Sequence, residues 1–400
     1  MTSPVGIGRF VCERNKVVLG AALSSRGVRP SRAPEPSMYL TFRWFGPEDP
    51  VPLAHVRQIP GVEGVVSALY DVPVGEAWPA DGVERLRDTV GEAGLRLSVV
   101  ESIPVHEDVK LGRPSRDRLV DAWCESVARV GAAGVPVVCY NFMPVFDWTR
   151  TDLAMALGDG STALAYDDRA LARVDLSRGT GDLPGWAAAY SAEALGALLA
   201  AYRAVPAEAL WEHLAYFLER AAPAAEAAGV RLAIHPDDPP WPIFGLPRVV
   251  TSGAALERVT RLVDSPANGV TFCTGSLGAD PSLDLPAAVR RLGARVHFAH
   301  CRNVRVTGAG PGGRAFHESP HPSAFGSVDM LAVVRALRDV GFAGPARPDH
   351  GRMIWGETGR PGYGLYDRAL GATYLYGLWE AVSRAEAPAA PGPAHAHHAP

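Results

Sequence analysis

The sequence predicts an α/β fold in which eight strand and helix units close into a (β/α)8 barrel. Short apolar runs of strand length recur along the chain, as expected for strands buried on both faces of a parallel sheet. Amphipathic stretches of helical length separate most of these runs, and several end in glycine, a residue that favours the end of a helix. This alternation is typical of a barrel, with an open doubly wound sheet as the alternative.

Eight apolar runs define the predicted strands. In chain order they are YLTFRWF (39–45), GVVSALY (64–70), LRLSVVES (95–102), VPVVCYNF (135–142), VRLAIHP (230–236), GVTFCTG (269–275), VHFAHCRNV (296–304) and PARPDHG (345–351). The clearest predicted helices are DGVERLRDTVGEAG (81–94), SRDRLVDAWCESVARVGAAG (115–134) and VDMLAVVRALRDVG (328–341). Because all strands of such a barrel run the same way, their last residues should meet at one end of it.

The interval from Met143 to about Val205 is too long for an ordinary connection in a barrel. It contains DWTRTDLAM and an alanine-rich stretch of helical character. We therefore expect a long helical insertion after the fourth strand, at about 143–205, which forms a lid or a subunit contact over the strand ends.

The two ends of the chain differ in composition from the rest. Residues 1–37 finish in SSRGVRPSRAPEPS, which lacks periodicity, and are expected to be a disordered extension; Met38 is an alternative start of translation. Residues 386–400 are rich in Ala, Pro and His, which predicts a disordered tail. A single catalytic barrel domain is expected to occupy residues 38–385.

The composition predicts a globular cytoplasmic enzyme. Of the 400 residues, 47% are hydrophobic and 20% are charged, so the chain can bury a large core. A formal charge of −4 without a basic stripe argues against nucleic acid and anionic lipid as partners, although local arginines could bind a small anionic substrate. No apolar run approaches the roughly 18 residues of a membrane span. Five cysteines without CxxC spacing fit a reducing compartment.

Residues with metal-binding side chains stand at the ends of four predicted strands: His235, Cys273, His300 and Asp349. Alone, such a histidine is more often a hydrogen-bonded core residue, and such a cysteine a small buried hydrophobe. Together at one end of a barrel they favour a divalent metal site with nitrogen, sulfur and oxygen ligands. A buried Asp349 would need a cation, either a metal or an arginine. Strand alternation sends His297 to the face opposite His300, so at most one of the two looks into the barrel.

Polar residues near the predicted strand ends are candidates for substrate binding: Arg43, Tyr70, Asn141, Arg302, Asn303, His317 and Ser319. Arg43 could bind a substrate carboxylate or pair with an acid of the core. His317 and Ser319 belong to FHESPH, which predicts either a loop that closes over a small substrate or an exposed polar turn. Asn141 is followed by Asp147, which could instead cap a helix.

From Met38 to Ser383 the chain resembles the mannonate dehydratases of the UxuA type. The matching segments are MYLTFRWFGPEDPVPL, CYNFMPVFDWTRT, IHPDDPPWPIFGLPR, FCTGSLG, HFAHCRNV, FHESPH, RPDHGR and PGYGLYDRALGATYLYGL. The resemblance implies a TIM barrel of the xylose isomerase type, commonly a homo-oligomer. It also implies a lyase that converts D-mannonate to 2-dehydro-3-deoxy-D-gluconate and water in the catabolism of hexuronates such as glucuronate.

The same resemblance implies Mn²⁺ or Fe²⁺ at His235, Cys273, His300 and Asp349, with acid and base roles for His350 and Tyr363. Tyr366, three residues further on, is the rival of Tyr363. By softness alone, a thiolate with two imidazoles suits zinc or iron. The reaction needs these groups because a proton next to a carboxylate is hard to remove and a hydroxyl leaves poorly. Either His350 or Tyr363 could be the acid.

Other functions stay open at this point. A metal-dependent sugar isomerase on the same barrel would use similar ligands, although such sites are usually rich in carboxylates and contain a lysine. A dehydratase of a related aldonate, such as D-gluconate, would carry the same residues. A noncatalytic sugar-acid sensor should have lost a ligand or an acid–base group, and all of them are present in this sequence.

Overall fold

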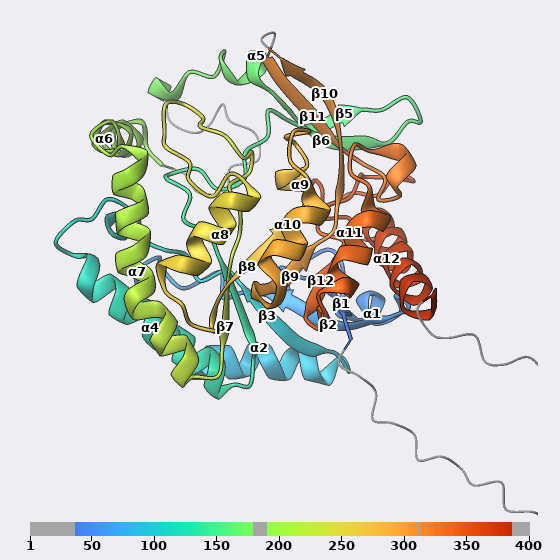
Figure 1. Cartoon of the computed structure of the whole chain (residues 1–400), viewed down its shortest axis with the longest axis horizontal. Helices are drawn as coiled ribbons and strands as arrows, with labels where there is room; N and C mark the ends of the chain where they lie inside the picture. Colours follow the sequence, from blue (N-terminus) through green and yellow to red (C-terminus); the bar gives the residue numbers. More distant parts are fainter. Residues whose placement is uncertain (1–36, 179–189, 311–312, 386–400) are drawn as a thin grey trace, which may run out of the picture. The chain divides into compact units, whose positions relative to one another are not determined.

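Eight parallel strands close into a barrel in the computed structural model, which describes residues 37–178, 190–310 and 313–385 (Figure 1). Around the barrel the order is β1, β12, β9, β8, β7, β4, β3 and β2. The strands are β1 (Tyr39–Arg43), β2 (Val62–Ser67), β3 (Arg96–Glu101), β4 (Val137–Tyr140), β7 (Arg231–Ile234), β8 (Asn268–Cys273), β9 (Val296–His300) and β12 (Pro345–Arg347). Each overlaps one of the eight predicted runs, so the predicted barrel is confirmed and the open sheet is wrong.

Helices cover the outside of the barrel (Figure 1). The helices outside the insertion are α1 (Leu53–Val56), α2 (Ala80–Glu92), α3 (Glu107–Lys110), α4 (Arg116–Ala132), α7 (Ala207–Ala227), α8 (Gly253–Leu262), α9 (Thr274–Leu277), α10 (Leu285–Leu292), α11 (Met330–Asp339) and α12 (Tyr366–Ala385), with short 3₁₀ turns at Gly293–Arg295 and Ser323–Phe325. The glycines predicted to end α2 and α4 do so: Gly94 and Gly134 have φ of 73° and 78°, a conformation that other residues rarely adopt.

The insertion after β4 begins with strands. It comprises β5 (Asp152–Ala156), β6 (Thr162–Asp167), α5 (Asp168–Leu171), a 3₁₀ turn (Leu176–Arg178) and α6 (Ala192–Tyr202); residues 179–189 lie outside the described residues. β6 pairs antiparallel with β11 (Gly313–Ser319), which also pairs with β10 (Asn303–Gly310). The result is a four-stranded sheet, β10-β11-β6-β5, that lies above the barrel strands in the view of Figure 1.

This second sheet corrects one prediction and refines another. FHESPH is neither a loop nor an exposed turn, because His317, Glu318 and Ser319 belong to β11. The insertion contains helix as predicted, but its first part is the β5–β6 hairpin. Ala165 pairs with His317, 152 residues further along the chain, so this strand pairing could not be predicted from a local sequence pattern.

The interior of the barrel is filled with side chains. An apolar cluster of Val66, Val99, Val137, Cys139, Ala233 and Phe298 occupies it. A much larger apolar cluster includes residues of the strands and of the surrounding helices. Residues two apart in a strand face the same way. A residue that lies two positions after a member of the interior cluster therefore faces the space at the carboxyl ends of the strands.

Within the three described ranges, no helix is long and apolar enough to cross a membrane. The predicted disordered tail at 386–400 lies outside the described residues, as does the predicted extension except for Ser37.

Candidate active site

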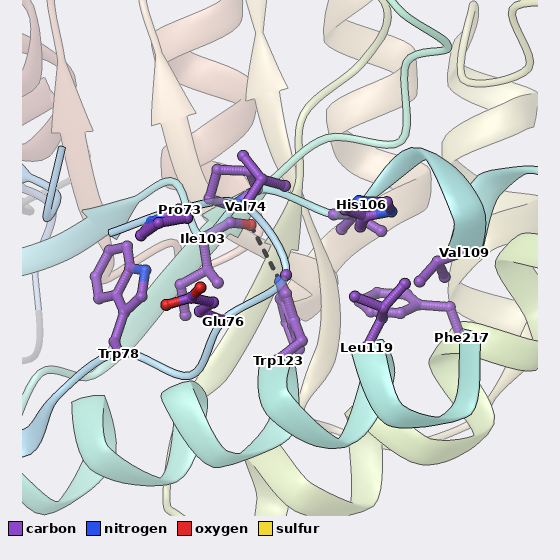
Figure 2. A pocket seen from close by; sticks show the side chains of 13 residues that line it. Pro73, Val74, Glu76, Trp78, Ile103, His106, Val109, Leu119, Trp123 and Phe217 are labelled. Carbon is purple, nitrogen blue, oxygen red and sulfur yellow. Dashed lines mark hydrogen bonds between the residues drawn. The ribbon is translucent and has the colours of Figure 1, made fainter. Parts of the chain in front are cut away.

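A cavity of about 630 Å³ lies at the carboxyl ends of the barrel strands. Its lining includes Arg43, Glu101, Asn141, His235, Arg302, Arg347, Asp349, His350 and Tyr363. A second depression, between the segment after β2, the segment after β3 and α4, measures only about 10 Å³ (Figure 2). There Trp123 of α4 donates a hydrogen bond to the carbonyl of Ile103 (3.0 Å). That space suits about one water molecule, so the larger cavity is the candidate active site.

Strand alternation explains how three of the predicted metal ligands meet. His235 follows Ala233 by two residues, and His300 follows Phe298 by two, so both histidines lie directly above the interior cluster. The potential ligand atoms of His235, Cys273 and His300 all lie within 4.8 Å of one another. His297 faces the other way, and its Nδ1 lies 2.6 Å from the carbonyl oxygen of Leu232. The choice of His300 over His297 thus agrees with the geometry.

The two histidines of the group have nitrogens free for a cation. Nδ1 of His235 lies 2.6 Å from the carbonyl oxygen of Pro236, so Nδ1 carries the proton and Nε2 keeps its lone pair. Both nitrogens of His300 are buried without a hydrogen-bond partner among the described residues. A buried polar atom without a partner is costly, and a bound cation would remove that cost.

Cys273 also fits a cation. Burial raises the pKa of its thiol to about 12, so the thiol keeps its proton in the absence of a positive charge. Its sulfur accepts a hydrogen bond from the backbone N–H of Ser276 (3.4 Å), which holds it at the end of β8. A divalent cation bound between two imidazoles is the kind of charge that displaces such a proton.

Asp349 lies beside this group and is also paired with arginines. Its Oδ2 is 3.8 Å from Sγ of Cys273 and 3.7 Å from Nδ1 of His300. Its Oδ1 is 2.7 Å from Arg347, and its Oδ2 is 3.2 Å from Arg302. Burial by itself would raise the pKa of Asp349, but the nearby positive charges, Arg347 foremost, hold it well below the ordinary value. Asp349 is therefore an anion with or without a metal.

The backbone at Asp349 lets two successive side chains reach the cavity. In a regular strand, Asp349 and His350 would point to opposite faces. Asp349 has a φ of 61°, in the left-handed region that few residues other than glycine and Asp or Asn adopt. The chain turns there, after the end of β12, and both side chains line the cavity.

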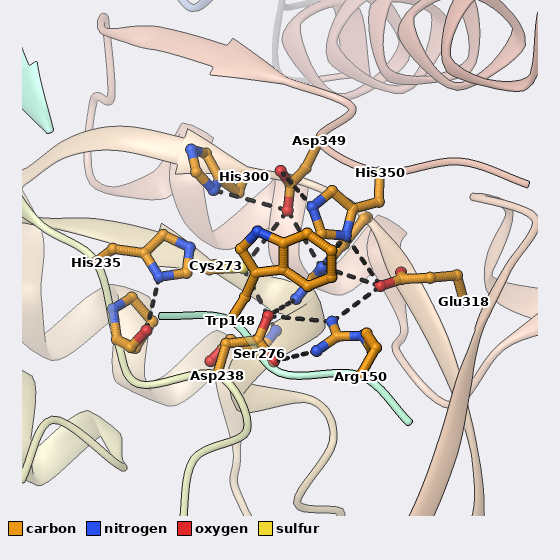
Figure 3. Close-up of polar contacts among 12 residues, drawn as sticks. Trp148, Arg150, His235, Asp238, Cys273, Ser276, His300, Glu318, Asp349 and His350 are labelled. Atoms are coloured by element: carbon orange, nitrogen blue, oxygen red, sulfur yellow. Dashed lines mark hydrogen bonds and ion pairs between the residues drawn. The ribbon is translucent and has the colours of Figure 1, made fainter. Parts of the chain in front are cut away.

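Opposite the candidate metal-binding group of His235, Cys273 and His300 lies a buried network of ion pairs (Figure 3). Arg150 binds Asp238 through both Nη atoms (2.9 and 3.1 Å) and also binds Glu318 (3.0 Å). Arg302 binds the same two acids, at 2.6 Å from Asp238 and 3.0 Å from Glu318. The four side chains are at most 1% exposed. Each charge therefore has at least two partners of opposite sign, which offsets much of the cost of its burial.

His350 joins this network to Tyr363. Its Nδ1 is 3.1 Å from Glu318, and its Nε2 is 2.8 Å from the hydroxyl of Tyr363. The edge of the Trp148 ring packs against the imidazole, with ring centroids 5.5 Å apart (Figure 3). Burial lowers the pKa of His350 and raises the pKa of Tyr363, which favours the neutral form of both. The two titratable side chains form a hydrogen-bonded pair at the cavity wall.

Four of the seven predicted substrate contacts line the cavity: Arg43, Tyr70, Asn141 and Arg302. Arg43 lines it while pairing with Glu101 (3.1 Å), so both of its predicted alternatives are compatible with its position. Asn141 donates to Asp147 (3.0 Å), which lies in an irregular segment and caps no helix. The cavity lining formed by the described residues does not include Asn303, His317 or Ser319.

The three other predicted contacts have partners elsewhere. The Asn303 amide donates to the backbone carbonyls of His321 and Val328 and accepts from the N–H of Val328, which fixes the segment before α11. His317 lies within β11, with its Nδ1 2.8 Å from the carbonyl oxygen of Glu318. Ser319 ends the same strand and is buried.

Several site residues were missed: Glu101, Arg150, Asp238, Glu318, Arg347 and Arg360. The criterion that found Asp349 was a charged residue at or just after the end of an apolar run. Three of the missed residues also meet this criterion. Glu101 ends β3, Asp238 follows β7 closely, and Arg347 ends β12. Glu318 belongs to the FHESPH segment. Because that segment was interpreted as a loop or an exposed turn, burial of Glu318 was not expected.

A closed parallel barrel with a polar cavity at the carboxyl ends of its strands defines the class of TIM-barrel enzymes. A xylose isomerase domain protein from Planctomyces limnophilus shares this fold, with a TM-score of 0.54, 14% identity and coverage of 87% of this chain and 100% of that one. Residues 38–388 match the family model of D-mannonate dehydratase (UxuA), and the chain belongs to this family.

Relatives of the family match nearly from end to end. The chain is 54% identical to mannonate dehydratase 2 of Halalkalibacterium halodurans over 348 residues, which are 86% of this chain and 100% of the relative. It is 53% identical to mannonate dehydratase of Streptococcus uberis over 350 residues, 87% and 99% of the two chains. The crystal structure of mannonate dehydratase from Streptococcus suis serotype 2 superposes with a TM-score of 0.80 at 50% identity, covering 87% of this chain and 95% of that one.

Proposed function

We propose that this chain is a hydro-lyase that converts D-mannonate to 2-dehydro-3-deoxy-D-gluconate and water, a step in the catabolism of hexuronates such as glucuronate. Membership of the D-mannonate dehydratase family supports this activity. The observation that carries the proposal is that His350 and Tyr363 line the same cavity as His235 and Asp349. The ligand atoms of Cys273 and His300 lie close to that of His235. Elimination of water needs both a proton acceptor and a proton donor at one substrate, and the pair of His350 and Tyr363 offers both.

The proposed cofactor is Mn²⁺ or Fe²⁺, held by His235, Cys273, His300 and Asp349. Support comes from the unpaired nitrogens of His300, the free Nε2 of His235 and the closeness of Asp349 to Cys273. Bound there, the cation would neutralise negative charge that develops beside the substrate carboxylate.

His350 and Tyr363 are the proposed proton carriers. One of them takes the proton from C2, and the other gives a proton to the departing hydroxyl at C3. Because the hydroxyl of Tyr363 lies 2.8 Å from Nε2 of His350, a proton can pass between the two groups and reset both after each turnover. Glu318, 3.1 Å from Nδ1, stabilises the imidazolium whenever His350 carries the extra proton.

The proposed substrate contacts are Arg43, Tyr70, Asn141 and Arg302. Arg43 and Arg302 are positively charged side chains at the cavity wall, suited to a sugar acid. Tyr70 has half of its surface exposed at the cavity and can donate to or accept from a sugar hydroxyl. One N–H of the Asn141 amide donates to Asp147, and the second N–H can donate to a substrate hydroxyl.

Formation of the 2-keto-3-deoxy acid from D-mannonate tests the proposal. The protein is stripped with EDTA and assayed under reducing conditions with and without Mn²⁺, and D-gluconate and a free aldose are assayed in parallel. Product from D-mannonate alone, and only with metal, is expected. Turnover of D-gluconate instead would indicate a dehydratase of a related aldonate, and ketose formation an isomerase. No turnover by folded, metal-loaded protein would favour a sugar-acid sensor.

Two further proposals concern assembly and location. We propose a homo-oligomer, supported by exposed apolar side chains around the start of α12: Trp355 is 74% exposed and packs on Tyr366, and Leu370 is 50% exposed. Light scattering of the purified protein tests it, with a mass near one chain as the contrary result.

We also propose a cytoplasmic location, because Cys124, Cys139, Cys273 and Cys301 are all free thiols. Fractionation of the source cells tests it.

A further inference from the structure

Glu101 is a charged residue in an unusual place, at the end of β3 and at the wall of the active-site cavity. It follows Val99 of the interior cluster by two residues and so faces the same space as the metal-binding group. Its side chain is 14% exposed and lies between two arginines, with Oε2 3.1 Å from Arg43 and Oε1 3.1 Å from Arg347. These two ion pairs hold the carboxylate in one orientation.

The same carboxylate faces His300. Nδ1 of His300 lies 3.7 Å from Oδ2 of Asp349, on the side of Cys273, as Figure 3 shows. The other ring nitrogen, Nε2, lies 3.6 Å from Oε1 of Glu101. An imidazole that binds a metal through one nitrogen carries its proton on the other, and that N–H normally donates to a carboxylate, a carbonyl or water.

His300 has a strong need for such an acceptor. Its side chain is fully buried, and neither nitrogen has a hydrogen-bond partner among the described residues. Two side chains with acceptor atoms, Glu101 and Cys139, form a close group with His300. The sulfur of Cys139 is a weak acceptor and already accepts from the hydroxyl of Thr271 (3.2 Å). Of the two, the carboxylate of Glu101 is therefore the better suited to accept from an N–H at Nε2.

We propose that Glu101 is a positioning residue for the metal site. Its carboxylate holds the proton of His300 on Nε2, so that the lone pair of Nδ1 points toward Cys273 and Asp349. The inference rests on the proposed function, because it requires a metal at His300. At 3.6 Å the two groups are at ion-pair distance, a few tenths of an ångström beyond a hydrogen bond. Arg43 and Arg347 keep the carboxylate in place.

The test is the affinity for Mn²⁺, measured by competition with a chelator on the full-length protein. Glu101→Ala should bind Mn²⁺ about 10- to 100-fold more weakly than the wild type. Glu101→Gln keeps an acceptor oxygen and should recover part of the loss. Glu92→Ala removes an exposed carboxylate at the end of α2, outside the cavity lining, so its affinity should change by less than about threefold. Thermal unfolding of all variants without metal separates this effect from loss of fold.

Stoichiometry and spectroscopy sharpen the test. With ¹⁵N-histidine label and Zn²⁺ as a diamagnetic probe, the wild type should show a protected N–H proton on Nε2 of His300. The signal is assigned through its loss in His300→Asn, and Glu101→Ala should weaken or abolish it. Equal Mn²⁺ affinity in wild type and Glu101→Ala would overturn the inference. Two ions per wild-type chain and one per Glu101→Ala chain would also overturn it, since Glu101 would then be a ligand.

Failure of this inference differs from failure of the proposed function. If the wild type converts D-mannonate and binds one Mn²⁺ as tightly as Glu101→Ala does, only the role of Glu101 is wrong. If the wild type binds no Mn²⁺, the metal site and the inference are both wrong, and the product assay decides the activity separately.

Discussion

The two sides of the cavity differ in how their polar groups are satisfied. On one side, the nitrogens of His300 have no hydrogen-bond partner among the described residues, and Cys273 keeps a proton that a cation would displace. On the other side, Arg150 and Arg302 share Asp238 and Glu318, so every charge is paired. On the first side a buried imidazole has no hydrogen-bond partner among the described residues, whereas on the second side each charged group is paired with groups of opposite sign.

The difference teaches what each side contributes. Buried polar atoms without a hydrogen-bond partner are costly. A bound ion would offset this cost by bonding to those atoms. A network in which each charge has two partners of opposite sign instead holds its members in place, and here it contacts His350 through Glu318. Substitutions on the first side should therefore change metal binding with little change in stability. Substitutions on the second side should change stability first.

The largest effect is expected at Cys273. Cys273→Ser should lose most of its bound metal and lower turnover by about 10³-fold, while the fold is kept. Cys301→Ser is the matched control, because Cys301 is also buried and its backbone N–H bonds to β12, but it is outside the metal-binding group. Metal content after gel filtration, turnover and thermal unfolding are measured on both. Full metal content and activity in Cys273→Ser would remove the residue from the site.

The paired side predicts a loss of stability instead. Arg150→Met leaves Asp238 and Glu318 each with one partner fewer in a fully buried place, so the free energy of unfolding should fall by about 3–5 kcal/mol. Arg290→Met breaks the pair with Asp339 at the surface, where water screens the charges, and should change stability far less. Urea unfolding compares them. Equal losses would mean that the buried network does not hold the fold.

Tyr363 lines the cavity and is one of the two proposed proton carriers. Tyr363→Phe removes the hydroxyl bonded to His350 and should lower turnover by about 10²-fold with metal content unchanged. Tyr366→Phe, three residues on, deletes the same atom from an exposed ring outside the cavity lining and should keep wild-type turnover. Steady-state kinetics and metal analysis test both. A larger loss in Tyr366→Phe, or loss of metal in Tyr363→Phe, would contradict the assignment.

The barrel and much of the site could be predicted because they follow local rules. Buried parallel strands are apolar runs, and the last residues of such runs must meet at one end. This rule found His235, Cys273 and His300, which form a group in the structure. Strand alternation then separated His300 from His297, whose ring bonds to the carbonyl of Leu232.

The second sheet and the placement of Asp349 and His350 could not be predicted, because they depend on contacts between distant segments or on backbone geometry. β5 alternates between exposed and half-buried residues and reads as a surface segment, and β6 finds its partner β11 about 150 residues away. The same alternation that placed His300 would have put Asp349 and His350 on opposite faces. Only the left-handed backbone at Asp349 brings both into the cavity, and the sequence does not reveal that turn.

The smallest expected effect concerns pH and Glu318. Burial would raise the pKa of Glu318, but Arg302, His350 and Arg150 together lower it from 4.5 to about 2. The folded state then binds fewer protons than the unfolded state between these values. The stabilisation from Glu318 is therefore present above about pH 4.5 and is lost as the pH falls toward 2.

Glu318→Gln removes this titration, so below about pH 4.5 the wild type should lose stability more steeply than the variant, by roughly 1 kcal/mol per pH unit. Glu84→Gln makes the same change on the exposed face of α2 and should follow the wild-type curve. Unfolding by urea is followed from about pH 5 to about pH 3, with EDTA present so that metal release does not contribute. Parallel curves for wild type and Glu318→Gln would show that Glu318 is not held as a carboxylate, and that the second side of the cavity is less completely paired than its geometry indicates.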